Sequence, residues 1–150
     1  MAYKYRIIAE EVTGSPAIKV KGAPDAARYL YANCFTGNYR ESCWALLLDA
    51  QRNILGHYLV SEGACNSTII DKKNIALVAL NAFADSVILS HNHPSGNVTP
   101  SARDKEETFA LKRALECVDL RLLDHVIVSE DKYYSFAEEH TYKRARRRSL

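Results

Sequence analysis

The feature that most constrains the fold is a short apolar segment that leads into two histidines and then into the start of a helix. Residues 85–90, DSVILS, have the character of a buried strand. His91 and His93 follow directly. Residues two apart at the end of a strand project toward the same side, so both imidazoles can face one point. The segment predicts a strand–loop–helix unit with polar side chains at the junction.

Thr99 and Pro100 indicate where the helix begins, because a hydroxyl can cap exposed backbone N–H groups and proline suits the first helical position. The predicted helix spans residues 100–117. Ser101 and Asp104 are three apart and share a face of its first turns, which can turn back toward the two histidines. Two ring nitrogens and one carboxylate oxygen would then hold a metal ion, with a fourth position left to water.

This mixed set of nitrogen and oxygen ligands favours zinc, because magnesium and calcium bind mostly oxygen. Zinc lowers the pKa of a bound water from about 15.7 to roughly 7, and turnover then needs another group that moves the proton. A His-x-His pair alone is more often a surface pair than a metal site. The proline, the glycine and the Ser-x-x-Asp element that follow this pair favour the metal site.

The length and composition fit one compact domain, because 150 residues at 47% hydrophobic content can form a real core. No apolar run is long enough to span a bilayer, and the polar start is unlike a secretory signal. We therefore expect a cytoplasmic protein with no membrane partner. The cysteines form no Cys-x-x-Cys pair, so we expect reduced core residues rather than a zinc ribbon or a disulfide framework. They are Cys34, Cys43, Cys65 and Cys117.

The net charge of +2 hides an asymmetry along the chain. Five of the 20 basic residues lie within residues 143–148, which leaves 15 basic against 18 acidic residues elsewhere, a net charge of −3. A body of that sign is a poor partner for nucleic acid. Any nucleic-acid contact would be weak and would come from the basic tail, although short basic ends are usually just solvated.

The alternation of apolar runs and helical patterns indicates an α/β sheet with helices on both faces. We expect helices at residues 24–35, 71–83 and 100–117, and an opening hairpin at residues 5–12 and 17–21. Further strands are expected at residues 42–49, 54–61, 87–90, 121–128 and 133–136.

From about residue 24 to residue 138 the sequence resembles the RadC-type branch of the JAB/MPN metalloprotease superfamily. The family signature is a distant glutamate followed by His-x-His-Pro and Ser-x-x-Asp, to which HNHPSG at 91–96 and SARD at 101–104 are similar. LLDHVIV at 122–128 resembles a closing strand of the family. The resemblance implies a three-layer α/β/α sandwich, related to cytidine deaminases, with a mixed central sheet.

The same resemblance divides the chain into three parts. Residues 1–23 would form an N-terminal β-hairpin extension, residues 24–140 the RadC-like JAB/MPN domain, and residues 141–150 a basic C-terminal tail. Relatives of the RadC type often carry a helix-hairpin-helix module before this domain. The residues before Pro24 are too few and too strand-like for one, so we expect no DNA binding by that route.

The resemblance also implies a zinc-dependent hydrolase that cleaves a peptide or isopeptide bond of a protein or peptide substrate. His91, His93 and Asp104 would bind the zinc ion. Glu41 lies 50 residues before His91, at the start of the first long core strand, and would accept the proton of the attacking water and return it to the leaving amine. Ser101 would donate a hydrogen bond to the oxyanion, a contact whose loss costs roughly 2.7–4 kcal/mol.

Several of these roles have alternatives. Glu62 is a rival for Glu41 as the base. The alternative role of Glu41 itself is that of an ordinary solvated charge at the start of a strand. Asn74 stands where some family members carry another carboxylate, so it cannot serve as a base. Ser101 can equally be a helix-cap hydroxyl.

The remaining polar residues around the motif are weaker candidates. Asn92 can orient the histidine loop, contact substrate or simply stabilise the loop. His125, in an apolar strand, is expected to be a hydrogen-bonded core residue or a support for the ligands, whereas His57 and His140 are expected to be exposed.

Two other functions compete with the hydrolase. One is a binding module associated with DNA repair or mobile elements, in which the metal site is vestigial. The other is a nucleobase deaminase, which we set aside because neither His-x-Glu nor Pro-Cys-x-x-Cys occurs. The sequence indicates neither the substrate nor the oligomeric state.

Overall fold

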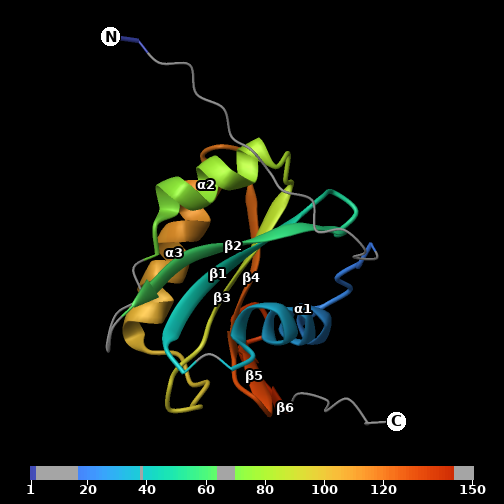
Figure 1. Cartoon of the computed structure of the whole chain (residues 1–150), viewed down its shortest axis with the longest axis vertical. Helices are drawn as coiled ribbons and strands as arrows, with labels where there is room; N and C mark the ends of the chain where they lie inside the picture. The colour runs from blue at the N-terminus through green and yellow to red at the C-terminus, as the bar shows by residue number, and fades with distance from the viewer. Residues whose placement is uncertain (3–16, 38, 64–69, 144–150) are drawn as a thin grey trace.

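A mixed six-stranded sheet organises the molecule (Figure 1). The computed structural model describes residues 1–2, 17–37, 39–63 and 70–143, with the backbone alone at 142 and 143. The strand order is β2-β1-β3-β4-β5-β6, and within the described residues β3 and β4 are the one parallel pair. The strands are β1 Glu41–Leu48, β2 Ile54–Gly63, β3 Ser86–His91, β4 Arg121–Val128, β5 Lys132–Ser135 and β6 His140–Lys143.

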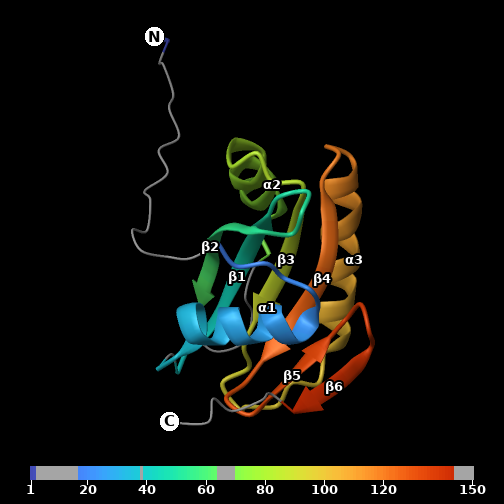
Figure 2. The same ribbon diagram turned by 90° about the vertical axis from the view of Figure 1, so that its right-hand side faces the viewer.

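Helices cover both faces of this sheet (Figure 2). Helix α1 (Ala23–Leu30), continued by the π-helical turn η1 (Tyr31–Phe35), lies on one face. Helices α2 (Lys72–Asn81) and α3 (Ala102–Glu116) lie on the other. The predicted three-layer α/β/α sandwich with a mixed central sheet is therefore confirmed.

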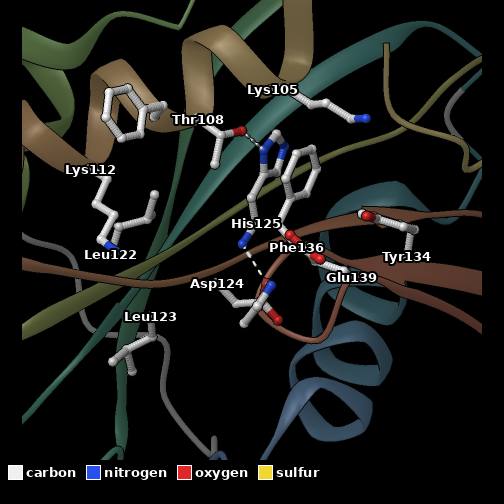
Figure 3. A pocket seen from close by; sticks show the side chains of 12 residues that line it. Lys105, Thr108, Lys112, Leu122, Leu123, Asp124, His125, Tyr134, Phe136 and Glu139 are labelled. Carbon is white, nitrogen blue, oxygen red and sulfur yellow. Dashed lines mark hydrogen bonds between the residues drawn. The ribbon is translucent and has the colours of Figure 1, made fainter. Parts of the chain in front are cut away.

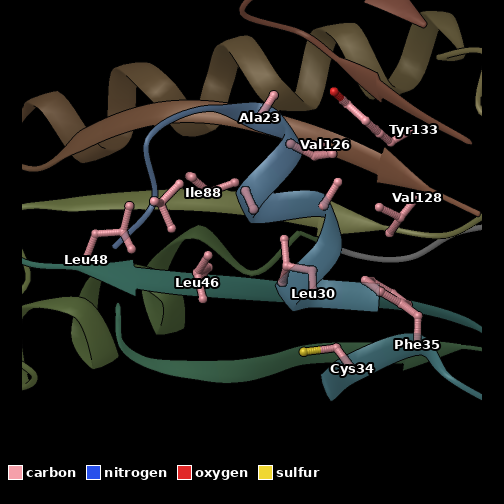
Figure 4. Close-up of a cluster of buried hydrophobic side chains, with 13 residues drawn as sticks. Ala23, Leu30, Cys34, Phe35, Leu46, Leu48, Ile88, Val126, Val128 and Tyr133 are labelled. Atoms are coloured by element: carbon pink, nitrogen blue, oxygen red, sulfur yellow. The ribbon is translucent and has the colours of Figure 1, made fainter. Parts of the chain in front are cut away.

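Two hydrophobic cores form because the central strands are buried on both faces. On the α1 side, Leu46 and Ile88 pack beneath Leu30 (Figure 4). On the other side, Ala45 packs with Leu111 beneath α2 and α3. Successive residues of a strand point to opposite faces, so β1 supplies both cores and reads as a continuous apolar run. This alternation also decides which polar side chains can reach α3.

Helix α3 begins later than predicted. Its N-cap is Ser101, and the helix itself starts at Ala102, so the interpretation of Thr99 as the cap and Pro100 as the first helical residue is wrong. The reason is the capping box between Ser101 and Asp104, which satisfies backbone N–H groups on both residues.

The two ends of the domain also differ from expectation. No strand forms at residues 17–21: Lys19 makes one isolated bridge with Asn53 and Val20 packs into the α1-side core, while the predicted strand at 5–12 lies outside the described residues. Strand β6 was not predicted, because its sequence, HTYK, lacks an apolar pattern. It continues past residue 141, where the tail was expected to begin. The division of the chain into three parts stays a prediction.

The described cysteines are all free thiols. Cys34 and Cys43 are buried, as expected, but Cys117 is exposed, so its assignment to the core is wrong. Cys65 lies outside the described residues. Among the described helices none is both long and apolar enough to cross a bilayer.

Candidate metal centre

Two histidines and an aspartate converge where β3 ends and α3 begins. The Nε2 atoms of His91 and His93 lie 2.9 Å apart. Asp104 places Oδ1 3.4 Å from His91 Nε2 and Oδ2 3.4 Å from His93 Nε2. One donor atom from each residue lies within 4.8 Å of the others, so the group can hold a metal ion. The structure thus brings together the three side chains that the motif predicted as ligands.

The alternation of side chains between the two faces of β3 explains this convergence. Val87 and Leu89 pack in the core beneath α2 and α3, so His91, the next residue of the same parity, faces α3 as well. Asp104 lies in the first turn of α3. The parity of one strand and the first turn of one helix therefore place a nitrogen and a carboxylate on the same side of the sheet.

The loop after β3 fixes the ring of His93. Its Nδ1 lies 2.7 Å from the carbonyl oxygen of Asn97, and because a carbonyl only accepts, Nδ1 must donate. Gly96, with a φ of 75°, allows the chain to turn back at this point. In the neutral ring Nε2 then carries a lone pair, which is the form that binds a metal ion.

Asp104 is held ionised and in place. Its Oδ2 accepts from the Ser101 backbone N–H at 2.7 Å, and its own N–H donates to Ser101 Oγ at 3.0 Å. Burial alone would raise the pKa of Asp104, but the rings of His91 and His93, which donate to the carboxylate when their Nε2 atoms are protonated, outweigh burial and hold the pKa well below its usual range. The hydrogen bond that the protonated ring of His93 makes to Asp104 in turn raises the pKa of His93, with a smaller contribution from the charge of Glu41.

Ser101 is a helix cap, and that role does not exclude the catalytic one. The cap uses a lone pair of Ser101 Oγ and leaves its hydrogen available. The side chain is exposed beside Asp104. Its role as an oxyanion donor stays a prediction.

Glu41 faces the same side of the sheet as the ligands. Cys43, two residues further along β1, lies in the core beneath α2 and α3 and pairs with His91 across the two strands. Glu41 shares its parity and therefore its face. The pKa of Cys43 is raised by burial and then by the negative charges of Glu41 and Asp104, which places both carboxylates nearby.

The rival carboxylate faces the other way. Glu62 pairs directly with Ser42 on the neighbouring strand, and directly paired residues project to the same face. Ser42 has the parity of Leu46, which packs beneath α1. Glu62 therefore lies on the face opposite the ligands. Asn74 takes part in the cap of α2, where its N–H donates to Asp71 Oδ1 at 3.0 Å.

Asn92 joins the histidine loop to the start of β1. Its Oδ1 accepts from the Ser42 N–H at 2.8 Å and its Nδ2 donates to the Arg40 carbonyl at 2.9 Å. These two backbone groups flank Glu41, so a single buried amide connects the segment that carries the predicted base to the loop that carries the predicted ligands. The structure thus shows that Asn92 anchors this loop to the start of β1, and contact with substrate stays a prediction.

The other histidines differ in their surroundings. His125 is fully buried and its Nε2 lies 2.7 Å from His91 Nδ1, so the expectation of a hydrogen-bonded core residue is confirmed. Burial lowers the pKa of His125 well below its ordinary value, so the ring is neutral. His140 is exposed as expected. His57 is half-buried and its Nδ1 contacts the Tyr29 hydroxyl at 3.0 Å, so its expected exposure is wrong.

A cavity of about 340 Å³ opens beside the centre. It is lined by His93 and Asn92 and by three aromatic residues, Tyr31, Phe35 and Tyr39, which sequence reasoning did not find. No local pattern connects them to the motif, because they come from the segment that follows α1.

Comparison with known protein families matches residues 20–141 to the RadC-like JAB domain. The UPF0758 protein of Chlorobaculum parvum is 38% identical over 120 residues, which are 80% of this chain and 54% of that protein. The UPF0758 protein of Streptococcus sanguinis is 43% identical over 104 residues, 69% of this chain and 46% of that protein. The chain thus spans about half the length of the curated relatives it matches. The chain belongs to the RadC-like JAB domain family.

Proposed function

We propose that this domain is a zinc-dependent hydrolase that cleaves a peptide or isopeptide bond. The observation that carries the proposal is the convergence of His91, His93 and Asp104 on one point, with Glu41 on the same face of the sheet. Two imidazole nitrogens and a carboxylate oxygen are a donor set that zinc accepts and that magnesium and calcium do not prefer.

The donor chemistry fits a cation. Asp104 is ionised, and the neutral ring of His93 turns a lone pair toward it and toward His91. Three such donors at close range repel one another unless a proton or a metal ion lies among them. A zinc ion held there would supply a Lewis acid that lowers the pKa of a water to about 7.

The remaining steps belong to the side chains of this chain. Glu41 accepts a proton from the attacking water and returns it to the leaving amine, the two-way task of a general acid–base residue. Ser101 donates its hydroxyl hydrogen to the oxygen on which negative charge develops. Asn92 keeps the backbone on both sides of Glu41 in register with the histidine loop. The aromatic cavity beside His93 receives the part of the substrate next to the scissile bond.

Elemental analysis and isotope labelling test the proposal together. The purified chain should hold about one zinc ion, and His93→Ala should lose it. A mixture of unstructured peptides incubated in ¹⁸O-water should gain the label at newly formed carboxyl ends, as read by mass spectrometry. Glu41→Gln should keep the zinc and abolish labelling, because an amide preserves shape but cannot take a proton.

Glu62→Gln is the matched control, because it makes the same chemical change on the opposite face and should leave labelling intact. Metal content far below one that added zinc cannot restore would refute the metal centre. Loss of zinc in Glu41→Gln would make Glu41 a ligand or a structural residue instead of a base.

A further inference from the structure

Behind the metal centre, a line of hydrogen bonds runs from His91 into α3. His91 Nδ1 lies 2.7 Å from His125 Nε2. His125 Nδ1 in turn lies 2.5 Å from Thr108 Oγ1 (Figure 3). The same hydroxyl oxygen lies 2.5 Å from the backbone carbonyl of Asp104. The line therefore begins on one predicted ligand and ends on the backbone of another.

The carbonyl at the end of this line decides where every hydrogen lies. Two oxygens at 2.5 Å repel unless a hydrogen lies between them, and a carbonyl has none, so the Thr108 hydroxyl donates to Asp104. A hydroxyl has only one hydrogen. His125 Nδ1 must therefore carry the hydrogen that joins it to Thr108.

The consequence passes to His91. A neutral imidazole that is protonated at Nδ1 has a lone pair at Nε2, so His125 Nε2 accepts and His91 Nδ1 donates. The hydrogen of a neutral His91 is then at Nδ1, and its Nε2 lone pair points toward His93 and Asp104. This is the one neutral tautomer in which Nε2 of His91 can bind a metal ion.

We propose that Thr108 and His125 are positioning residues of the metal centre, which hold His91 in its metal-binding tautomer and tie it to the backbone of Asp104. The inference rests on the proposed zinc site and adds to it two residues outside the ligand motif. Metal-binding histidines usually donate their second N–H to a carboxylate, a carbonyl or water, whereas this one donates to another histidine.

The ring of His125 is packed in place by its neighbours. It stacks on Phe136 with ring centroids 4.5 Å apart and planes 5° from parallel. Its backbone N–H donates to Asp124 Oδ1 at 2.7 Å (Figure 3). Its carbonyl accepts from the N–H of Phe136 at 3.0 Å. Asp124 is itself held by the Ser135 hydroxyl at 2.6 Å. The line of hydrogen bonds from His91 through His125 to Thr108, which we call the relay, is therefore part of the folded core rather than a feature of the loop.

The tautomers can be measured in the unmodified, metal-free chain by long-range ¹H–¹⁵N correlation of the histidine rings, well above the ordinary imidazole pKa of about 6.5. We expect both His91 and His125 to carry hydrogen at Nδ1. This measurement needs neither a variant nor an active enzyme. It decides the inference even if a variant fails to fold.

Zinc affinity, measured by competition with a chromophoric chelator, tests the consequence. Thr108→Val keeps the shape but removes the hydroxyl, and we expect its dissociation constant for zinc to rise about 10–100-fold. Thr108→Ser restores the hydroxyl and should bind zinc like the unmodified chain. Thr36→Val is a matched control that should leave zinc affinity unchanged. It removes the same kind of hydrogen bond, from a threonine hydroxyl to a backbone carbonyl (Tyr31, 2.8 Å), at the end of η1.

The outcomes separate this inference from the proposed function. An unmodified chain that binds no zinc would refute the metal centre and with it any role in positioning a ligand. A chain that binds zinc but whose His91 carries hydrogen at Nε2 would refute the relay alone. So would Thr108→Val if it bound zinc as tightly as Thr108→Ser.

Discussion

Replacing Ser101 by alanine should destabilise the metal-free domain by removing half of the α3 capping box. The Asp104 N–H loses the Ser101 Oγ that accepts from it at 3.0 Å. The reciprocal bond, from the Ser101 backbone N–H to Asp104 Oδ2 at 2.7 Å, needs no serine side chain and remains. Loss of a serine N-cap costs about 0.5–2 kcal/mol, typically ~1 kcal/mol. For a chain of this size, ~1 kcal/mol corresponds to a fall in Tm of about 2–4 °C.

Urea denaturation followed by circular dichroism would measure the change in the free energy of unfolding. Ser101→Asp is the matched control, because aspartate caps helices as well as serine does and adds a negative charge at the N-terminus of the helix. It should recover the stability that alanine loses. A loss below about 0.5 kcal/mol in the alanine variant, which is the range of ordinary surface changes, would refute the reasoning. Failure of aspartate to recover stability would refute it equally.

Three further predictions concern the charges of the site, the loop anchor and the tail. The lowered pKa of Asp104 contributes stability above about pH 3.9 that is lost as pH falls. The raised pKa of His93 contributes stability below about pH 6.5 that is lost as pH rises through the pKa of the folded state. The free energy of unfolding of the metal-free chain should therefore peak between these limits. A urea series across pH checks this, and a peak that persists in Asp104→Asn would contradict it. Asn92→Ala removes the hydrogen bonds to the backbone of Ser42 and Arg40 and should cost about 1–3 kcal/mol in the same assay; an unchanged midpoint would mean that the amide does not anchor the loop. Deleting residues 144–150 should leave zinc content and Tm unchanged, because this polar run lacks the apolar residues of a core element. Any binding of labelled duplex DNA should be weak, with a salt slope of about −0.9 for each of at most five phosphate contacts, and the deletion, which removes four of the five basic residues of the tail, should lose most of it. Tight binding that survives both deletion and physiological salt would favour a DNA-repair module over a hydrolase.

The sequence by itself determined the parts of the site that lie close together along the chain. His91 and His93 are two residues apart at the end of a strand, and Ser101 and Asp104 occupy one turn of a helix. For such neighbours the local geometry of strand and helix decides which side chains converge. The central strands and the three helices were predictable for the same reason, since their periodicity is local. Strand β6 carries no such pattern and could not be predicted.

Only the tertiary structure showed which carboxylate shares the face of the ligands and which residues contact them from behind. The resemblance favoured Glu41 over Glu62, and the pairing of β1 with β2 places the two on opposite faces. Thr108 could have been suspected, because it lies four residues after Asp104 on the same face of α3. Its partner could not, because His125 reaches it only through the parallel register of β4 with β3, in which His125 stands beside Leu89. A slip of one residue in that register would turn His125 to the α1 face and break the relay, and no local pattern specifies such a register.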